Sequence, residues 1–224
     1  MMNRFKGLFA LIAVLSITAS AAAALFFVYP PYSLPAGRTY SAQAASWWKW
    51  ALSQPTSKSP LLDSTGANCA QGQSGLVWFL AGTVDGQPVT RSCTIPAGKH
   101  LIFPVVNAAY FAFESDPAEQ KTESFLRSQV EFIRESTELE VEIDGVSVKN
   151  VSSYFERSDI FGVTLPADNI YGLPTGFKLT PAADAGFYIA LAPLLGGQHT
   201  IHFHATMPDG TEQDVTYNLT VKWF

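Results

Sequence analysis

Charged residues are scarce in this chain. They make up 15 % of its 224 residues, against 47 % hydrophobic residues, and 14 Lys and Arg face 19 Asp and Glu, for a net charge of −5. Nucleic acids and anionic lipid surfaces attract proteins through clustered Lys and Arg, so neither is expected as the main partner. The high hydrophobic content excludes a disordered chain and predicts one domain with a substantial core.

Cysteine is rarer still. The two cysteines, Cys69 and Cys93, lack the Cys-x-x-Cys spacing of a redox pair. An even number of cysteines in an exported chain predicts a structural disulfide rather than reactive thiols. This bond would close a loop of about 25 residues and stabilise the fold by about 3 kcal/mol.

Catalytic motifs are also missing. Gly72-Gln73-Ser74-Gly75 is one residue short of the Gly-x-Ser-x-Gly nucleophile elbow, and it precedes a strand, whereas the elbow needs a strand-to-helix turn. No glycine pattern of a phosphate-binding loop is present. We therefore predict no catalytic residues. The leading hypothesis is a non-catalytic binding or structural module of the cell envelope or the secreted fraction.

The N-terminus, in contrast, carries a clear export signal. Arg4 and Lys6 precede an apolar run that ends in small residues, a pattern typical of a cleaved secretory signal over residues 1–24. The apolar character resumes as far as Val28, so the segment is also long enough to remain as a membrane anchor. Both alternatives place the domain outside the cytoplasm, either periplasmic or secreted, or attached to the membrane through this segment.

The following residues predict an arm, a short helix and a loop. Three prolines within residues 25–38 favour extended backbone. Ser41 is the expected N-cap of a helix that Pro55 ends, and a long surface loop over residues 53–75 follows. The buried face of the helix is expected to carry Ala44, Trp47, Trp48 and Ala51.

Strand signals dominate the rest of the chain. Residues 76–81 are apolar on both faces, which is typical of a central strand. Asp85-Gly86 predicts a hairpin into residues 87–95, and residues 99–106 predict the next strand.

One long helix interrupts these strands. Asp116 is its expected N-cap, Pro117 takes the first helical position, and Glu119 is the capping acid. Its buried stripe is expected to comprise Leu126, Val130 and Ile133.

Two later hairpins predict their own register. A two-residue turn at Asp144-Gly145 places Ile143 opposite Val146. At residues 208–210 a two-residue turn would mix polar and apolar partners, so we expect a three-residue loop there. That loop pairs two apolar residues, Phe203 with Val215, and two polar ones, His204 with Asp214.

Together these elements predict an antiparallel β-sandwich with a short N-terminal helix and one longer inserted helix. The expected organisation is a signal over residues 1–24, extending as an anchor to residue 28 if uncleaved. An arm over residues 25–38 and a single β-rich domain over residues 39–224 follow.

Two histidines form the sharpest candidate site. His202 and His204 lie two residues apart on a predicted strand, so both point the same way and can reach one metal ion, with Asp214 as an oxygen ligand. Zinc or copper suits these ligands, and a metal-dependent enzyme or metal carrier is the competing hypothesis. The alternative is a solvated sheet face, as expected also for the three alternating glutamates of residues 138–142.

Tryptophan offers a second candidate. Trp50 is expected to point away from the buried face of its helix, where its indole would be available to a sugar ring or an apolar protein partner. A glycan-binding module is therefore a further alternative, against a role in core packing for the neighbouring tryptophans.

Several blocks of sequence occur together along the chain. They are Trp47-Trp48-x-Trp50-Ala51-Leu52, Asn68-Cys69-Ala70, Val77-Trp78-Phe79-Leu80-Ala81-Gly82, Arg91-x-Cys93-x-Ile95-Pro96-Ala97-Gly98-Lys99, Phe103-Pro104-Val105-x-Asn107 and Asp214-Val215-Thr216-Tyr217-Asn218-Leu219-Thr220-Val221. As a set they resemble a group of uncharacterised exported bacterial proteins. The resemblance touches most of the exported chain. It implies bacterial export and brings no activity, cofactor or site residue.

Overall fold

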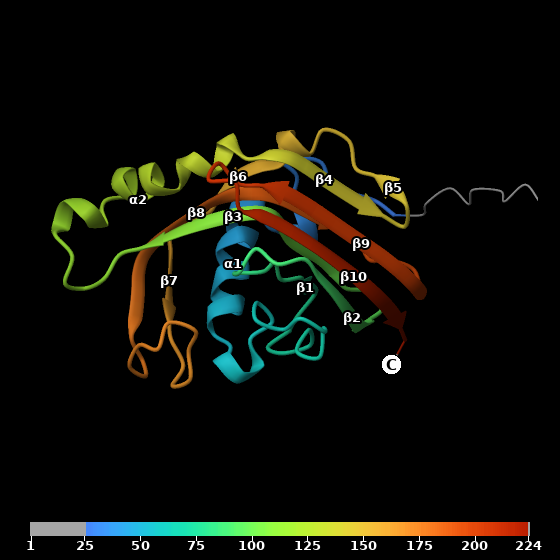
Figure 1. Cartoon of the computed structure of the whole chain (residues 1–224), viewed down its shortest axis with the longest axis horizontal. Helices are drawn as coiled ribbons and strands as arrows, with labels where there is room; N and C mark the ends of the chain where they lie inside the picture. Colours follow the sequence, from blue (N-terminus) through green and yellow to red (C-terminus); the bar gives the residue numbers. More distant parts are fainter. Residues whose placement is uncertain (1–25, 224) are drawn as a thin grey trace, which may run out of the picture.

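The computed structural model describes residues 26–223, so the predicted signal lies outside the described residues. Strands make up 38 % of the described residues and helices 20 %, which makes the fold mostly β. Two five-stranded mixed sheets pack as a sandwich (Figure 1). Among residues 26–223 no helix is both long and apolar enough to cross a membrane.

Sheet A has the strand order β1-β3-β8-β6, and β7 also pairs with β8. Its strands are β1 Val77–Phe79, β3 His100–Phe111, β6 Phe155–Arg157, β7 Phe161–Thr164 and β8 Lys178–Leu191. The long antiparallel pair β3 and β8 forms its centre, and β1 joins β3 in parallel.

Sheet B has the strand order β2-β10-β9-β4-β5. Its strands are β2 Val89–Pro96, β4 Thr137–Ile143, β5 Val146–Ser147, β9 Gly197–Thr206 and β10 Glu212–Lys222. β2 joins β10 in parallel, and the other neighbours are antiparallel. The predicted layered β fold is thus confirmed, whereas purely antiparallel pairing is wrong.

The main core fills the space between the sheets. Phe103 of β3 stacks on Phe203 of β9, with the ring centroids 4.9 Å apart, and both side chains are fully buried. Inward residues alternate with outward polar ones along β9 and β10, as the two-residue period of a strand requires.

Helix α1, Tyr40–Leu52, covers the outer face of sheet A. Thr39 caps it by accepting a hydrogen bond from the Ala42 amide at 3.2 Å, so the expectation of Ser41 as the cap is wrong. Ser41 already lies in the first turn, where its hydroxyl donates to Glu156. The stripe on sheet A comprises Tyr40, Ala44, Trp47, Trp50 and Ala51.

The proline-rich arm lies along the edge of β8. Val28 forms a bridge with Leu191, and the Tyr29 amide donates to the Ala190 carbonyl at 2.9 Å. This contact holds the chain that leads into α1.

The pairing expected for residues 76–95 is wrong in two respects. β1 is an edge strand, and both of its faces are covered because α1 packs on Phe79 while Trp78 enters the core. The turn at Asp85-Gly86 makes no hairpin, because β1 and β2 belong to different sheets. A local turn motif contains no information on the partner that β2 finds in β10.

The long helix expected from Asp116 is divided into three segments. They are the 3-10 helix Ala118–Lys121, α2 Glu123–Val130 and the 3-10 helix Glu131–Glu135. Thr122 separates the first two segments because its backbone is extended, and its side chain caps α2. Asp116 is not the cap of a long helix as expected; its carboxylate accepts a hydrogen bond from the Phe113 amide. The predicted stripe of Leu126, Val130 and Ile133 is buried, on the side of sheet A opposite α1 (Figure 1).

Both later hairpins are confirmed. β4 and β5 pair Ile143 with Val146, and β9 and β10 pair His204 with Asp214. Gly210, with φ +84°, supplies the left-handed residue of the three-residue loop.

The predicted disulfide joins Cys69 to Cys93. It anchors the loop of residues 53–75 to β2. Because disulfides form in oxidising surroundings, the bond indicates an extracytoplasmic environment.

The same loop covers an open edge of each sheet. At β2 the Ser92 amide donates to the Thr65 carbonyl at 2.8 Å. At β1 the side-chain amide of Gln73 takes the place of a neighbouring strand, since it accepts from the Phe79 amide at 3.0 Å and donates to the Phe79 carbonyl at 2.8 Å. Exposed strand edges pair with other chains, so this loop blocks such pairing at two places.

Candidate functional site

Three tryptophans on α1 tie the helix to the molecule. Trp47 and Trp50 are buried, and Trp48 is half-buried. Trp50 is only 7 % exposed; its indole N–H donates to the Gln71 carbonyl, and its ring centroid lies 5.5 Å from that of Phe79. The expectation that Trp50 points away from the buried face is wrong, because residues three apart share one helical stripe. Only a small part of its surface is therefore available to a ligand.

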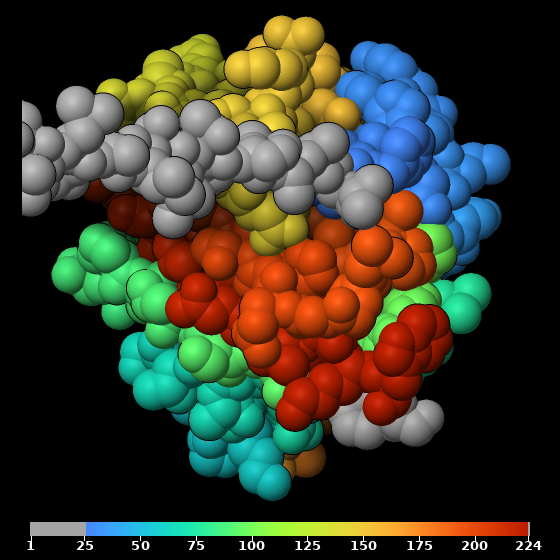
Figure 2. Space-filling view, turned by 90° about the vertical axis from the view of Figure 1, so that its right-hand side faces the viewer, coloured from blue at the N-terminus to red at the C-terminus, as the bar shows by residue number. Residues whose placement is uncertain are grey.

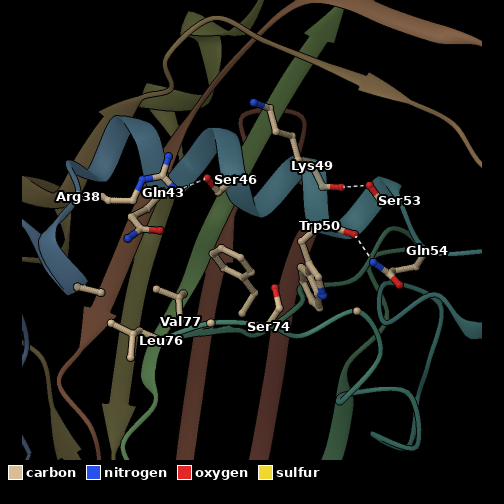
Figure 3. Close-up of a pocket in the computed structure, with 14 residues that line it drawn as sticks. Arg38, Gln43, Ser46, Lys49, Trp50, Ser53, Gln54, Ser74, Leu76 and Val77 are labelled. Atoms are coloured by element: carbon tan, nitrogen blue, oxygen red, sulfur yellow. Dashed lines mark hydrogen bonds between the residues drawn. The ribbon is translucent and has the colours of Figure 1, made fainter.

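A groove of about 600 Å³ separates α1 from the chain that leads into β1. Figure 3 shows Trp50 pointing from the helix toward the floor, and Ser74 pointing from the floor toward the helix. Leu76, Val77 and Phe79 supply apolar surface on that floor. This volume and mixed lining are typical of small-molecule sites.

Two buried amides add polar groups to the groove. Gln43 Nε2 donates to the Pro35 carbonyl at 3.0 Å, and Gln54 Nε2 donates to the Trp50 carbonyl at 2.8 Å. Neither side-chain oxygen accepts a hydrogen bond from any residue that the structure describes. Both oxygens can therefore accept one from a ligand.

The lining of the groove includes cations but no acid. Arg38 and Lys49 are among the lining residues, and no Asp or Glu is. The Lys49 side chain points away from the floor in Figure 3, and the Lys99 ammonium donates to the Gly75 carbonyl. The Arg38 guanidinium lies against α1 on the groove lining, beside Ser46, so Arg38 is the one of these three cations that is neither turned away from the floor nor bound to it.

The floor is held rigidly from below. Gln73 binds the β1 backbone, and the disulfide at Cys69 anchors the preceding turn. Gly72 has φ +65°, and a Cβ there would lie 2.3 Å from the Gln54 amide nitrogen. The left-handed backbone favours glycine at this approach of loop to helix, and a larger residue would displace the Gln54 amide.

A buried polar network lies beneath α1. The Asp184 carboxyl accepts hydrogen bonds from the Trp48 indole at 2.6 Å and from the Tyr188 hydroxyl at 2.9 Å. The Asn107 amide donates to the same hydroxyl at 2.8 Å. Gly186 lies between Asp184 and Tyr188 on this face, and a Cβ there would lie 2.5 Å from the Cβ of Asn107.

Burial raises the pKa of Asp184 to about 7, and the hydrogen bonds from Trp48 and Tyr188 offset only part of this effect. The carboxyl group is fully buried, so it has no surface for a ligand. Its role in the geometry is to tie α1 to β8.

The candidate metal ligands lie on the outer face of sheet B. His202 Nε2 lies 2.9 Å from Asp214 Oδ1, whereas His204 Nε2 lies 4.0 Å from Glu212 Oε2. Within residues 26–223 no group of three or more His, Cys, Asp or Glu side chains is arranged to hold a metal ion. The zinc or copper site at His202, His204 and Asp214 stays a prediction. Figure 2 views the molecule from the right-hand side of Figure 1, and the last part of the chain, orange to red, lies at the surface there.

Sequence reasoning missed Asp184 and the groove. Asp184 is the one acid in the apolar run of residues 182–191, and an isolated acid in such a run is a signal for a buried carboxyl. The groove has no comparable signal, because its walls are brought together by the pairing of β1 with β3 and by the disulfide.

Comparison with known proteins adds no assignment. No protein-family model, no curated protein and no solved structure matches this chain.

Proposed function

We propose that this protein is a non-catalytic binding module, periplasmic or secreted, that holds a small molecule in the groove between α1 and β1. The observation that carries the proposal is the convergence of an apolar floor, two unengaged amide oxygens and a guanidinium on one groove of about 600 Å³. In small-molecule binding sites, a few polar groups placed around apolar surface orient the ligand.

The rigidity of the groove supports the same function. A site that is already shaped before binding loses less entropy when the ligand enters. The disulfide, the Gln73 amide pair and the Trp50 indole bond each fix one part of the wall or floor. The export signal and the disulfide favour a ligand found outside the cytoplasm.

A blocked groove tests this proposal. Ser74 is exposed, and its side chain makes no hydrogen bond to a described residue, so Ser74→Trp fills the groove without removing a contact. Ser147→Trp on the exposed β5 is the matched control. The measurement is the shift in melting temperature of the purified exported chain with a small-molecule library of varied charge and polarity, because a ligand that binds only the folded state stabilises it.

We expect ligands that raise the melting temperature of the wild type and of Ser147→Trp but not that of Ser74→Trp. Binding that persists in Ser74→Trp, or a library with no stabilising compound, would overturn the proposed site.

A further inference from the structure

We infer that the ligand of the groove is a carboxylate, bound through Arg38. This inference rests on the proposed binding function and names the chemical class of its ligand. It follows from three observations on the charges, the free donors and the shape of the groove.

The first observation is that Arg38 has unused hydrogen-bond donors. Its Nη1 donates to the Ser46 hydroxyl at 2.9 Å and its Nη2 lies 3.5 Å from the Ala42 carbonyl, which leaves several of its N–H groups unused. Arg38 forms no ion pair with a carboxylate of the described residues. The contacts with α1 hold the guanidinium in place, so a bidentate bond to a carboxylate needs little further ordering.

The second observation is the position of this cation. Arg38 directly precedes Thr39, the N-cap of α1, and the first turn of α1 contains no acidic residue. The N-terminus of a helix is its positive end, where a further cation is unfavourable and an anion is favoured. In a chain with a net charge of −5, the groove is lined by no acid that would repel such an anion.

The third observation concerns the amount of charge. Lys49 also lines the groove, but its side chain points away from the floor, and Lys99 is bound to Gly75, so Arg38 supplies the one guanidinium on the lining. One cation matches a carboxylate, with its single charge, better than a doubly charged phosphate.

The rest of the groove defines the body of the ligand. Leu76 is 67 % exposed and lies beside Val77 and Phe79, so apolar surface is available next to the charged end. The oxygens of Gln43 and Gln54 accept hydrogen bonds, which suits hydroxyl or N–H groups. Two sources share this chemistry, an aromatic carboxylic acid and a sugar acid.

Paired probes test the carboxylate. Binding to the purified exported chain is measured by titration calorimetry for phenylacetate against phenylacetamide, and for a uronic-acid disaccharide against its neutral counterpart. Inorganic phosphate is titrated as a third anion. Arg38→Gln removes the charge, Arg38→Lys keeps the charge without the fork of donors, and the exposed Lys178→Gln on β8 is the control.

We expect at least one acid to bind about tenfold or more tighter than its neutral partner, since hydrogen bonds between two charged groups are about twice as strong as those between neutral groups. Arg38→Gln should abolish that difference, Arg38→Lys should keep part of it, and Lys178→Gln should keep all of it. The pair that shows the difference identifies the source as an aromatic acid or a sugar acid.

Four results would overturn the inference. Acid and neutral partner binding equally, a difference that survives Arg38→Gln, or phosphate binding tighter than either acid would each exclude a carboxylate held by Arg38. If no probe binds, the carboxylate class also fails. In all these cases the library measurement with Ser74→Trp still decides separately whether the groove is a binding site.

Discussion

The outer faces of the two sheets differ in what covers them. Sheet A is covered by α1, which leaves a groove along one side of the helix and buries Asp184 beneath it. Sheet B has an outer face of Thr, His and Glu side chains that are exposed or half-buried. The comparison teaches that a covering helix creates both a concave site and buried polar groups, whereas reactive residue types on a flat face create neither.

The largest expected effect comes from removing an anchor of α1. Trp47 is 1 % exposed, and its indole donates to the Leu80 carbonyl at 2.9 Å. Trp47→Ala should lower the free energy of unfolding by about 3–5 kcal/mol, measured by urea denaturation. Trp223→Ala, at a residue that is 82 % exposed, is the matched control and should change it by less than about 0.5 kcal/mol. Equal effects of the two changes would contradict the packing of α1.

The disulfide ranks next. Replacing both Cys69 and Cys93 by Ala should lower the free energy of unfolding by about 3 kcal/mol, because the closed loop has about 25 residues. The Ser92 amide, which donates to Thr65 of the loop, should then exchange its hydrogen faster. Unchanged exchange at Ser92 would show that the loop stays on the sheet edge without the covalent bond.

Local and distant strand pairs also differ in how far the sequence predicts them. The hairpins of sheet B are local, so the turn at residues 208–210 and the apolar pattern predict the register of Phe203 with Val215 correctly. The pairs of β1 with β3 and of β2 with β10 are parallel, and such pairs have no turn that specifies them. The groove needs β1 in its place beside β3, so it could not be predicted from the sequence either.

The helices show the same limit on a smaller scale. The buried stripe of Leu126, Val130 and Ile133 follows from its period alone, while the break at Thr122 does not. At the candidate sites, residue type was a poor guide. His202 and His204 were predicted as metal ligands from their residue type. Arg38 was not predicted as a binding residue, because its role depends on the absence of acids near it in the folded structure, which the sequence does not show.

The buried carboxyl beneath α1 gives a pH-dependent effect. The folded protein keeps the Asp184 proton up to about pH 7, whereas the unfolded chain releases it near the usual pKa of 3.8. The contribution of Asp184 to the free energy of unfolding therefore falls as the pH rises between these values, by at most about 1.4 kcal/mol per pH unit, and is level above them.

Comparison of wild type with Asp184→Asn isolates this contribution, because the other carboxyl groups are common to both. Urea denaturation at several pH values from 4.5 to 8 should show the variant gaining stability relative to wild type as the pH rises. The exposed Asp159→Asn is the control and should run parallel to wild type. A parallel curve for Asp184→Asn would exclude a raised pKa.

The smallest effect is expected on sheet B. His202 and Asp214 are both partly exposed, and such pairs contribute little to stability. His202→Gln and Asp214→Asn should each change the free energy of unfolding by less than about 0.5 kcal/mol. Elemental analysis of protein purified without an affinity tag completes this test. Stoichiometric zinc or copper that is lost in His202→Ala would favour the metal alternative and reverse the ranking of the two faces.

The most direct test of the central claim, that the ligand site lies on the covered face, is a map of binding on the whole molecule. ¹H–¹⁵N spectra of the purified protein are recorded with and without the tightest ligand of the library. We predict shifts of the Trp50 indole N–H and of the Ser74 and Val77 amides, with the amides of His202 and Thr216 unchanged. Shifts that gather on β9 and β10 and spare Trp50 would contradict the account.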